Sequence, residues 1–257
     1  TYNTKYTHIL EYIFCCYCLI YFNQVVRKQR LEEEKNRLMQ VGSQIAFQAE
    51  DNRRFAQSIL VDEQLQYLLE ENVKGNEFRR QSQYDKVTKR LGFYNNLRTY
   101  LEGSILQMAD GSFFGSSYSA MDTDYLEQKL QQRELQEYTE KEDWVYSNPY
   151  YDSDSGNDKR RICYAIPMYD KRRYGHLKAT LYLEMNLEYF LTQVKAYAET
   201  QDLVALIGNG SEILYQKDKK NVLRNAIKEK ELDQENIYHT SNGYLICIPV
   251  EGTGWKL

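Results

Sequence analysis

The chain contains little proline and glycine, the two residues that most often end or bend a helix. Only three of its 257 residues are proline, and 13 are glycine. Residues 25–72 contain no proline, and their only glycine is Gly42. Nothing in this stretch therefore excludes a single long helix.

The chain also lacks a surplus of charge of one sign. Its 33 lysine and arginine residues nearly balance its 37 aspartate and glutamate residues, and the net charge is −4. A nucleic-acid-binding domain is expected to carry a strongly basic surface. Two basic triplets, residues 159–161 and 171–173, flank an apolar run, so we expect them at opposite ends of one strand. The composition gives no support for a nucleic-acid partner of this segment.

The common arrangements of catalytic residues are absent from the sequence. His8, His176 and His239 are isolated, and neither Gly-x-Ser-x-Gly nor His-Glu-x-x-His occurs. The turn at residues 208–210 has Ile213 where a dinucleotide-binding fingerprint requires its third glycine. We therefore expect this segment to have no enzymatic activity and no cofactor.

Metal-binding patterns are incomplete as well. Cys15 and Cys18 have the spacing of half a zinc site, but the sequence has no second pair. The acidic loop at residues 152–158 resembles a calcium loop, yet its glycine is one position early and the closing glutamate is missing. A solvated hairpin loop is the favoured interpretation, and we expect no metal. Cys163 and Cys247 lie in separate predicted strands, and the sequence does not decide whether they form a disulfide.

Long hydrophobic runs are scarce. Residues 12–26 carry no charge, but these 15 residues are fewer than the ~20 that a helix needs to cross a bilayer. Lys5 precedes the run, whereas Arg27, Lys28 and Arg30 follow it, opposite to the distribution expected for an outward-facing C-terminal part. Residues 1–26 are predicted to be the end of a transmembrane helix, with a soluble amphipathic helix as the alternative.

The stretch at residues 25–72 has the pattern of one long amphipathic helix. Apolar or small residues recur mostly three or four positions apart and predict one buried stripe: Leu31, Leu38, Val41, Ile45, Ala49, Ala56, Ile59 and Leu60. Some 35 helical residues span roughly 50 Å, more than the width of a small domain. We therefore predict a stalk at residues 27–73 that carries two modules along its length. Asp62 is placed to cap a short helix that continues through residue 71.

Beyond the stalk, the sequence predicts an α+β fold with two antiparallel-sheet modules. A helix is expected at residues 78–101, followed by strands at 104–109 and 112–117, a helix or structured loop at 124–138, strands at 161–169 and 176–185, and a helix at 187–200. A second group has strands at 203–207, 212–216, 237–240, 244–250 and 255–257 and a helix at 221–231. The predicted modules are residues 74–200 and 201–257.

Aromatic side chains gather in one part of the first module. The chain has 24 tyrosines but only nine phenylalanines, and a flat face with a polar tip suits half-wet pocket walls. The cluster comprises Tyr138, Trp144, Tyr146, Tyr150, Tyr151, Tyr164 and Tyr169. It predicts either a small-ligand pocket or an aromatic core, and the sequence leaves both open.

The order of these elements resembles the double Cache extracytoplasmic sensor domain of bacterial transmembrane receptors, in particular sensor histidine kinases and membrane-bound AraC-type regulators. The resemblance begins near Val25 and depends on the order of individually weak motifs. These are the 59–69 segment, the strand ending in Asp110-Gly111, the Trp144 region, the 163–170 hairpin, the 206–215 strand pair and the closing residues 253–257.

The resemblance implies PAS-like modules and a small ligand in the membrane-distal one. Candidate ligand-binding residues are Tyr138, Lys141, Trp144, Tyr146, Arg161, Tyr164 and Asp170. The amino-acid-binding branch has an arginine two positions before its tryptophan, where this chain has Glu142, so binding of an α-amino acid through its carboxylate is in doubt. Lys141 or Arg161 is the candidate substitute.

The resemblance thus implies an extracytoplasmic ligand-sensing domain at the cell membrane, attached by the N-terminal helix and forming a homodimer through the stalk. A two-component sensor histidine kinase is the favoured output, in a cytoplasmic domain outside this segment. The alternative is a ligandless structural or partner-binding ectodomain that dimerises through the amphipathic stripe of the stalk.

Overall fold

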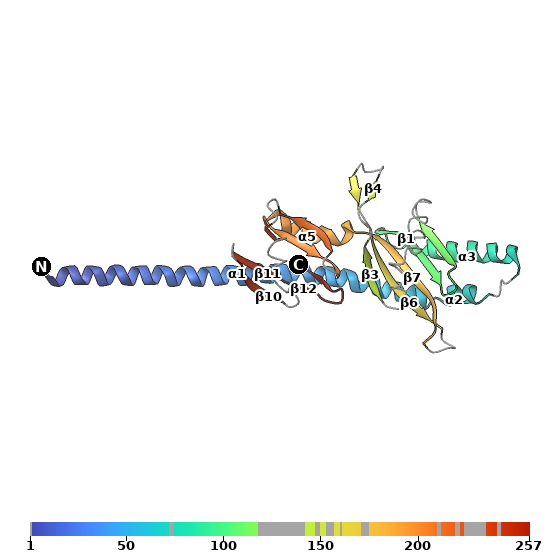
Figure 1. Ribbon diagram of the computed structural model, residues 1–257, viewed down its shortest axis with the longest axis horizontal. Coiled ribbons are helices and arrows are strands. Elements are labelled where there is room, and N and C mark those ends of the chain that lie inside the picture. The colour runs from blue at the N-terminus through green and yellow to red at the C-terminus, as the bar shows by residue number, and fades with distance from the viewer. Residues whose placement is uncertain are drawn as a thin grey trace.

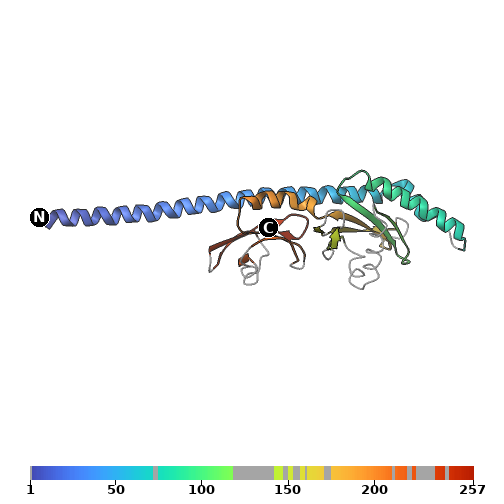
Figure 2. The ribbon, with the colours of Figure 1, turned by 90° about the horizontal axis from the view of Figure 1, so that it is seen from above.

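The computed structural model describes residues 2–71, 75–117, 142–146, 150–152, 157–159, 161–170, 175–209, 212–218, 222–223, 235–240 and 243–257. A long helix carries two sheet modules side by side along its C-terminal half, and its N-terminal part projects beyond both (Figure 1). The helices lie on one side of the sheets (Figure 2). The predicted α+β fold, a long N-terminal helix followed by two antiparallel-sheet modules, is confirmed.

Helix α1, Tyr2–Leu60, is 59 residues long, or about 90 Å. Its predicted stripe is buried against the rest of the chain at Leu38, Val41, Ile45, Ala49, Ala56 and Ile59. Its N-terminal aromatic residues are exposed instead, with exposed fractions of 73% for Tyr12 and 68% for Tyr17. The described residues contain no helix that is long and apolar enough to span a membrane.

The stalk helix ends earlier than residue 72, because a new helix is capped at Asp62. The Asp62 side chain accepts a hydrogen bond from the Leu65 N–H at 2.9 Å and starts α2, Glu63–Glu70. Asn76 caps α3, Glu77–Asn95, in the same way through the Arg79 N–H. These caps satisfy amide groups that the first turn of a helix leaves unpaired.

The module farther from the N-terminus, here the distal module, contains α2, α3 and a five-stranded antiparallel sheet of order β2-β1-β7-β6-β3. Its strands are β1 Leu101–Met108, β2 Phe113–Ser117, β3 Asp143–Tyr146, β6 Arg161–Tyr169 and β7 Leu177–Asn186. A small hairpin, β4 Tyr150–Asp152 and β5 Asn157–Lys159, stands between β3 and β6. Both predicted strand pairs are therefore present, β1 with β2 and β6 with β7.

Helix α3 stops at Asn95, six residues before the predicted end at residue 101. The buried Asn95 side chain donates a hydrogen bond from Nδ2 to the Ser116 carbonyl at 2.7 Å, which fixes the helix end to β2. Strand β1 then begins at Leu101 rather than at residue 104. A helical pattern of apolar residues does not reveal where a side chain of this kind ends the helix.

Helix α5, Glu188–Glu199, leads into the proximal module. Its strands are β8 Val204–Ile207, β9 Ile213–Lys217, β10 Asn236–Thr240, β11 Gly243–Cys247, β12 Pro249–Val250 and β13 Trp255–Lys256. They form a four-stranded sheet of order β12-β13-β8-β9 and the pair β10-β11. Two backbone hydrogen bonds of 2.8 Å pair Ile248, which connects β11 to β12, with Leu257, which follows β13.

Two predicted helices cannot be followed in this structure. The helix or loop at residues 124–138 lies outside the described residues, and so does most of the helix at 221–231, of which residues 222–223 are helical.

Candidate ligand-binding site

The distal sheet has two faces with different surroundings. Residues paired across antiparallel strands share a face, and neighbours along a strand alternate between faces. The inner face contains Trp144, its partner Tyr164 and the next partner Leu183, and it packs on the helices. The outer face contains Cys163 and its partner Glu184. The described helices lie on the inner side (Figure 2).

On the inner face, Trp144 belongs to an aromatic core. Its ring lies 4.7 Å from that of Tyr164, 5.4 Å from Phe190 and 5.1 Å from Trp255. Only 5% of Trp144 and 2% of Tyr164 is exposed. Because Phe190 belongs to α5 and Trp255 to the proximal sheet, this cluster joins the two modules.

An ion pair lies beside this aromatic cluster, on the side that faces α1. The Arg53 Nε lies 2.8 Å from Glu142 Oε1, which also accepts a hydrogen bond from the Tyr164 hydroxyl. Burial, and then the bond to Glu142, raises the pKa of Tyr164, so this hydroxyl stays protonated at neutral pH. Trp144, Tyr164 and Arg53 border an open groove of about 880 Å³ between α1 and the two modules.

The outer face holds a second apolar cluster that is separate from the main core. Ile105, Cys163, Ala165 and Tyr182 form it, and all four come from strands. Tyr182 is fully buried, and burial raises its pKa, so its hydroxyl is a neutral donor to Gln107 Oε1 at 3.3 Å. The cluster is apolar apart from the Tyr182 hydroxyl, and we call it the apolar floor of the outer face.

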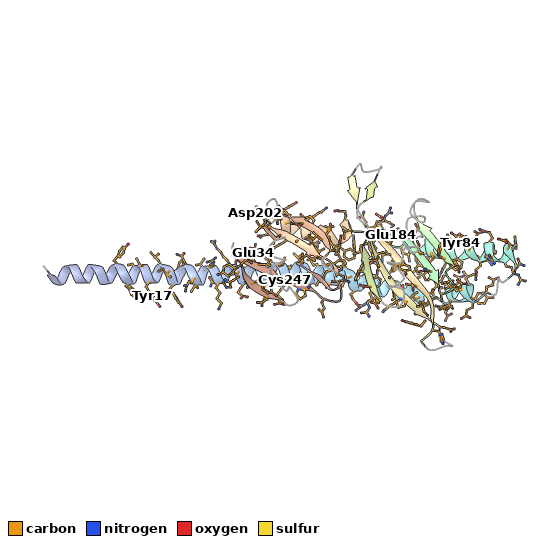
Figure 3. The ribbon with its side chains drawn as sticks, in the orientation of Figure 1. Tyr17, Glu34, Tyr84, Glu184, Asp202 and Cys247 are labelled. Atoms are coloured by element: carbon orange, nitrogen blue, oxygen red, sulfur yellow. The ribbon has the colours of Figure 1, made fainter. Side chains whose placement is uncertain are left out.

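A buried ion cluster lies beside this floor. The Arg161 Nε lies 2.5 Å from Glu102 Oε2 and 3.5 Å from Glu184 Oε1. Glu184 projects from β7 with an exposed fraction of 2%, and Arg161 has one of 9% (Figure 3). A carboxylate is this deeply buried only when it is paired. The described part of this cluster contains two carboxylates and one guanidinium.

The predicted ligand-binding residues do not form one group. Trp144 and Tyr164 lie together on the inner face, whereas Arg161 lies with the outer face at the start of β6. Asp170 follows the other end of that strand, roughly 30 Å away, where its N–H donates to the His176 carbonyl. The described backbone of Tyr146 pairs with Ile162. Tyr138 and Lys141 lie outside the described residues.

Glu102, Glu184 and Tyr182 were not among the candidate ligand-binding residues predicted from the sequence. A signal for two of them was present, because Tyr182 and Glu184 alternate with Leu181, Leu183 and Met185 along β7. Such alternation marks a strand with one face unlike the other. The signal was hidden by the length of the apolar run around it.

The described residues contain no group of three side chains that could hold a metal ion. Cys163 and Cys247 are buried in different modules and are not joined in a disulfide. Asn209, which follows β8, links the two modules, since its Nδ2 donates to Asp143 Oδ1 of β3 at 2.8 Å.

Comparison with known proteins places the chain among sensor folds. No protein-family model and no curated protein matches it. The sensory domain of the Campylobacter jejuni chemoreceptor Tlp3 with bound isoleucine matches with a TM-score of 0.56 and 16% identity, covering 90% of this chain and 91% of that one. The ligand-binding domain of the Pseudomonas aeruginosa chemoreceptor PctC with GABA matches with 0.56 and 14%, covering 90% and 97%.

The periplasmic sensory domain of the Campylobacter jejuni chemoreceptor Tlp1 is similar as well, with a TM-score of 0.56 and 12% identity over 86% of this chain and 91% of that one. At such identities the likeness establishes the fold. The chain therefore has the fold of the ligand-binding sensory domains of bacterial chemoreceptors, as the Cache resemblance predicts.

Proposed function

We propose that this chain is the extracytoplasmic ligand-sensing domain of a bacterial membrane receptor and binds a small molecule at the distal module. The observation that carries the proposal is the buried Arg161, Glu102 and Glu184 cluster beside an apolar floor, on the face of the sheet away from the described helices. The sensor fold supports it. No catalytic role is proposed for any residue.

The ligand class follows from the charge of this cluster. Glu102 and Glu184 place two carboxylates at this site, and carboxylates accept short, charge-assisted hydrogen bonds from ammonium groups. The isoleucine and L-valine of the Tlp3 structures and the GABA of the PctC structure all carry an amino group. We therefore infer a ligand with an ammonium group and an apolar part.

The signalling route is proposed to run through β3. Asp143 contacts Asn209 of the proximal module, and Glu142 contacts Arg53 of the stalk helix. Both acids belong to one edge of the distal sheet, so a shift of that edge is transmitted to α1 directly. The ligand must bind one position of this sheet edge more tightly than the other, because a ligand with equal affinity for both does not change their populations.

The remaining parts of the receptor are proposed from the sequence resemblance. Residues 1–26 would lead to the membrane, and the predicted stalk at residues 27–73 comprises the rest of α1 and the short helix α2, which packs in the distal module. Residues 74–200 and 201–257 are proposed to be the rest of the distal module and the proximal module. The output domain is proposed to be a two-component sensor histidine kinase. A chemotaxis signalling domain, as in the receptors of similar fold, is the second candidate.

The test is a thermal-shift screen of the whole chain against amino acids, amines, organic acids, sugars and purines. A ligand at 100 times its dissociation constant adds about 2.7 kcal/mol, or roughly 5–10 °C for a chain of this size. We expect a hit among amino compounds and no hit among simple organic acids.

Variants then locate the site. Glu184→Gln should weaken the hit at least tenfold in a calorimetric titration, because it removes the charge that faces the ammonium group. Glu199→Gln is the matched control, because it makes the same change at an exposed position at the end of α5, and it should leave the affinity within about twofold. Equal affinities for the wild-type chain and Glu184→Gln would contradict the assignment of the outer face.

A further inference from the structure

The proximal module contains a cavity that neither the distal site nor the signalling route uses. It lies between α1, the end of α5 and the proximal strands β8, β11 and β13, and its volume is about 220 Å³. All but three of its lining residues are apolar or aromatic; the three are Glu34, Gln201 and Lys256. Glu34 on α1 and Cys247 on β11, both labelled in Figure 3, line this cavity.

The cavity is partly open to solvent, and its volume far exceeds the voids that packing leaves inside a protein. Protein interiors contain few voids larger than a water molecule. A dry cavity of about 150 Å³ with apolar walls binds benzene, which has six carbon atoms. By the same proportion, this cavity has room for about nine non-hydrogen atoms.

Glu34 is one of the three polar residues that line this apolar space, and it accepts hydrogen bonds from two neighbours. The Glu34 Oε2 accepts hydrogen bonds from the Tyr197 hydroxyl and from Gln201 Nε2, both at 3.1 Å. Burial, and then the nearby Glu34, raises the pKa of Tyr197 to about 12, so this hydroxyl remains a donor. A hydroxyl or amide N–H of a ligand could donate to the same carboxylate, whereas a buried carboxylate of a ligand would face it unfavourably.

We propose that this cavity is a second ligand site, which binds neutral, mainly apolar molecules of up to about nine non-hydrogen atoms with one hydrogen-bond donor. Leu31, Glu34 and Leu38 of α1 form one wall, so such a ligand touches the stalk helix itself. A ligand on the distal sheet reaches α1 only through β3. The proximal site therefore acts on the stalk by a shorter path, and its existence does not depend on the distal site.

Benzyl alcohol, a neutral aromatic alcohol with eight non-hydrogen atoms, is the probe, and isothermal titration calorimetry on the whole chain is the measurement. We expect saturable binding with one site per chain. Benzoate has nearly the same size but carries a charge, and it should bind at least tenfold more weakly. The absence of saturable binding of benzyl alcohol would overturn the proposal.

A filling variant tests the location. Ala205 lies on β8 in the wall of the cavity, and Ala205→Leu places three further carbon atoms there. It should weaken benzyl alcohol binding at least tenfold, while Glu77→Gln, at an exposed position at the start of α3, should leave it unchanged. Unchanged binding by a folded Ala205→Leu chain would overturn the location.

An enlarging variant keeps the test decisive if Ala205→Leu does not fold. Leu38 is 6% exposed and lines the cavity from α1. Leu38→Ala should bind the larger 2-naphthol at least fivefold more tightly than the wild-type chain does. Equal affinity of both chains for 2-naphthol would show that the probe does not enter this cavity.

Discussion

At the scale of single residues, Asp62 joins several parts of the distal module. It caps α2, receives Arg90 Nε at 2.7 Å and accepts a hydrogen bond from the Tyr94 hydroxyl. Its side chain is 4% exposed. Burial alone would raise its pKa, but the bonds from Tyr94, the Leu65 N–H and Arg90 outweigh burial, and the pKa is lowered. Asp62 therefore stabilises the fold as a carboxylate.

We expect Asp62→Ala to lower the free energy of unfolding by about 2–4 kcal/mol, since it removes both a helix cap and the partner of Arg90. Asp62→Asn keeps the cap and should cost about 1–2 kcal/mol. Urea denaturation measures both. Equal losses for the two variants would contradict separate roles for cap and charge.

The same side chain makes a pH-dependent contribution. Because the folded pKa lies below the unfolded value of about 3.9, the contribution is complete above that value. It is lost as the pH falls through the lowered folded pKa. The difference in stability between the wild-type chain and Asp62→Asn should therefore shrink at acidic pH, in urea titrations repeated from pH 7 downward.

Trp144 has the chemistry of a ligand-contacting residue, but in this structure it belongs to the aromatic core. The sequence leaves open whether it lines a pocket or belongs to an aromatic core, and its ring packs against Tyr164, Phe190 and Trp255. We expect Trp144→Ala to cost about 3–5 kcal/mol of unfolding free energy, as for other buried large aromatics. A loss below about 1 kcal/mol in urea denaturation would contradict a core role.

At the scale of elements, α1 has two parts with different surroundings. From Leu38 to Ile59 its apolar stripe is buried in the chain's own core. This stripe is therefore not available as a dimer seam, and removing the residues before Asp62 would remove part of the core. A homodimer through the stalk must use another face of α1, on which Phe47 is 75% exposed and Met39 is 37% exposed.

Phe47→Glu tests this outward face. If the stalk forms a homodimer through it, a charge at the centre of the contact should weaken association at least tenfold, measured by sedimentation across a concentration series. Gln57→Glu is a control on an exposed position near the end of α1. An unchanged dimer in Phe47→Glu would exclude this face of the helix.

At the scale of the whole molecule, the many tyrosines have a collective effect on stability. Burial raises the pKa of Tyr100, Tyr164, Tyr182 and Tyr197, the last to about 12. Their unfolded pKa is about 10. A raised folded pKa means that the stabilisation is complete below pH 10 and is lost as the pH rises toward the folded value.

The unfolding free energy should therefore fall steadily above about pH 10, because the unfolded chain ionises first. Urea titrations between pH 8 and 12 measure the fall, and absorbance at 295 nm reports tyrosinate. Tyr197→Phe should reduce the slope between pH 10 and 12. A slope identical to that of the wild-type chain would show that this hydroxyl ionises freely in the folded state.

The amino-acid sequence by itself determines the local elements. The absence of proline from residues 25–72 allows the long helix, and Asp62 marks the start of the next one. The turn at Asp110-Gly111 and the two apolar runs within residues 161–185 define the strand pairs. These features depend on contacts within a few residues, which is why a linear pattern reveals them. The order of the elements was enough to predict the fold.

Tertiary structure decides which side of each element is covered. Arg161 and Tyr164 are three positions apart in one strand, so alternation already places them on opposite faces. Only packing shows that the helices cover the face of Tyr164 and that Arg161 meets Glu102 and Glu184 on the other. Such contacts join residues far apart in the sequence, and no local pattern encodes which distant side chains will meet.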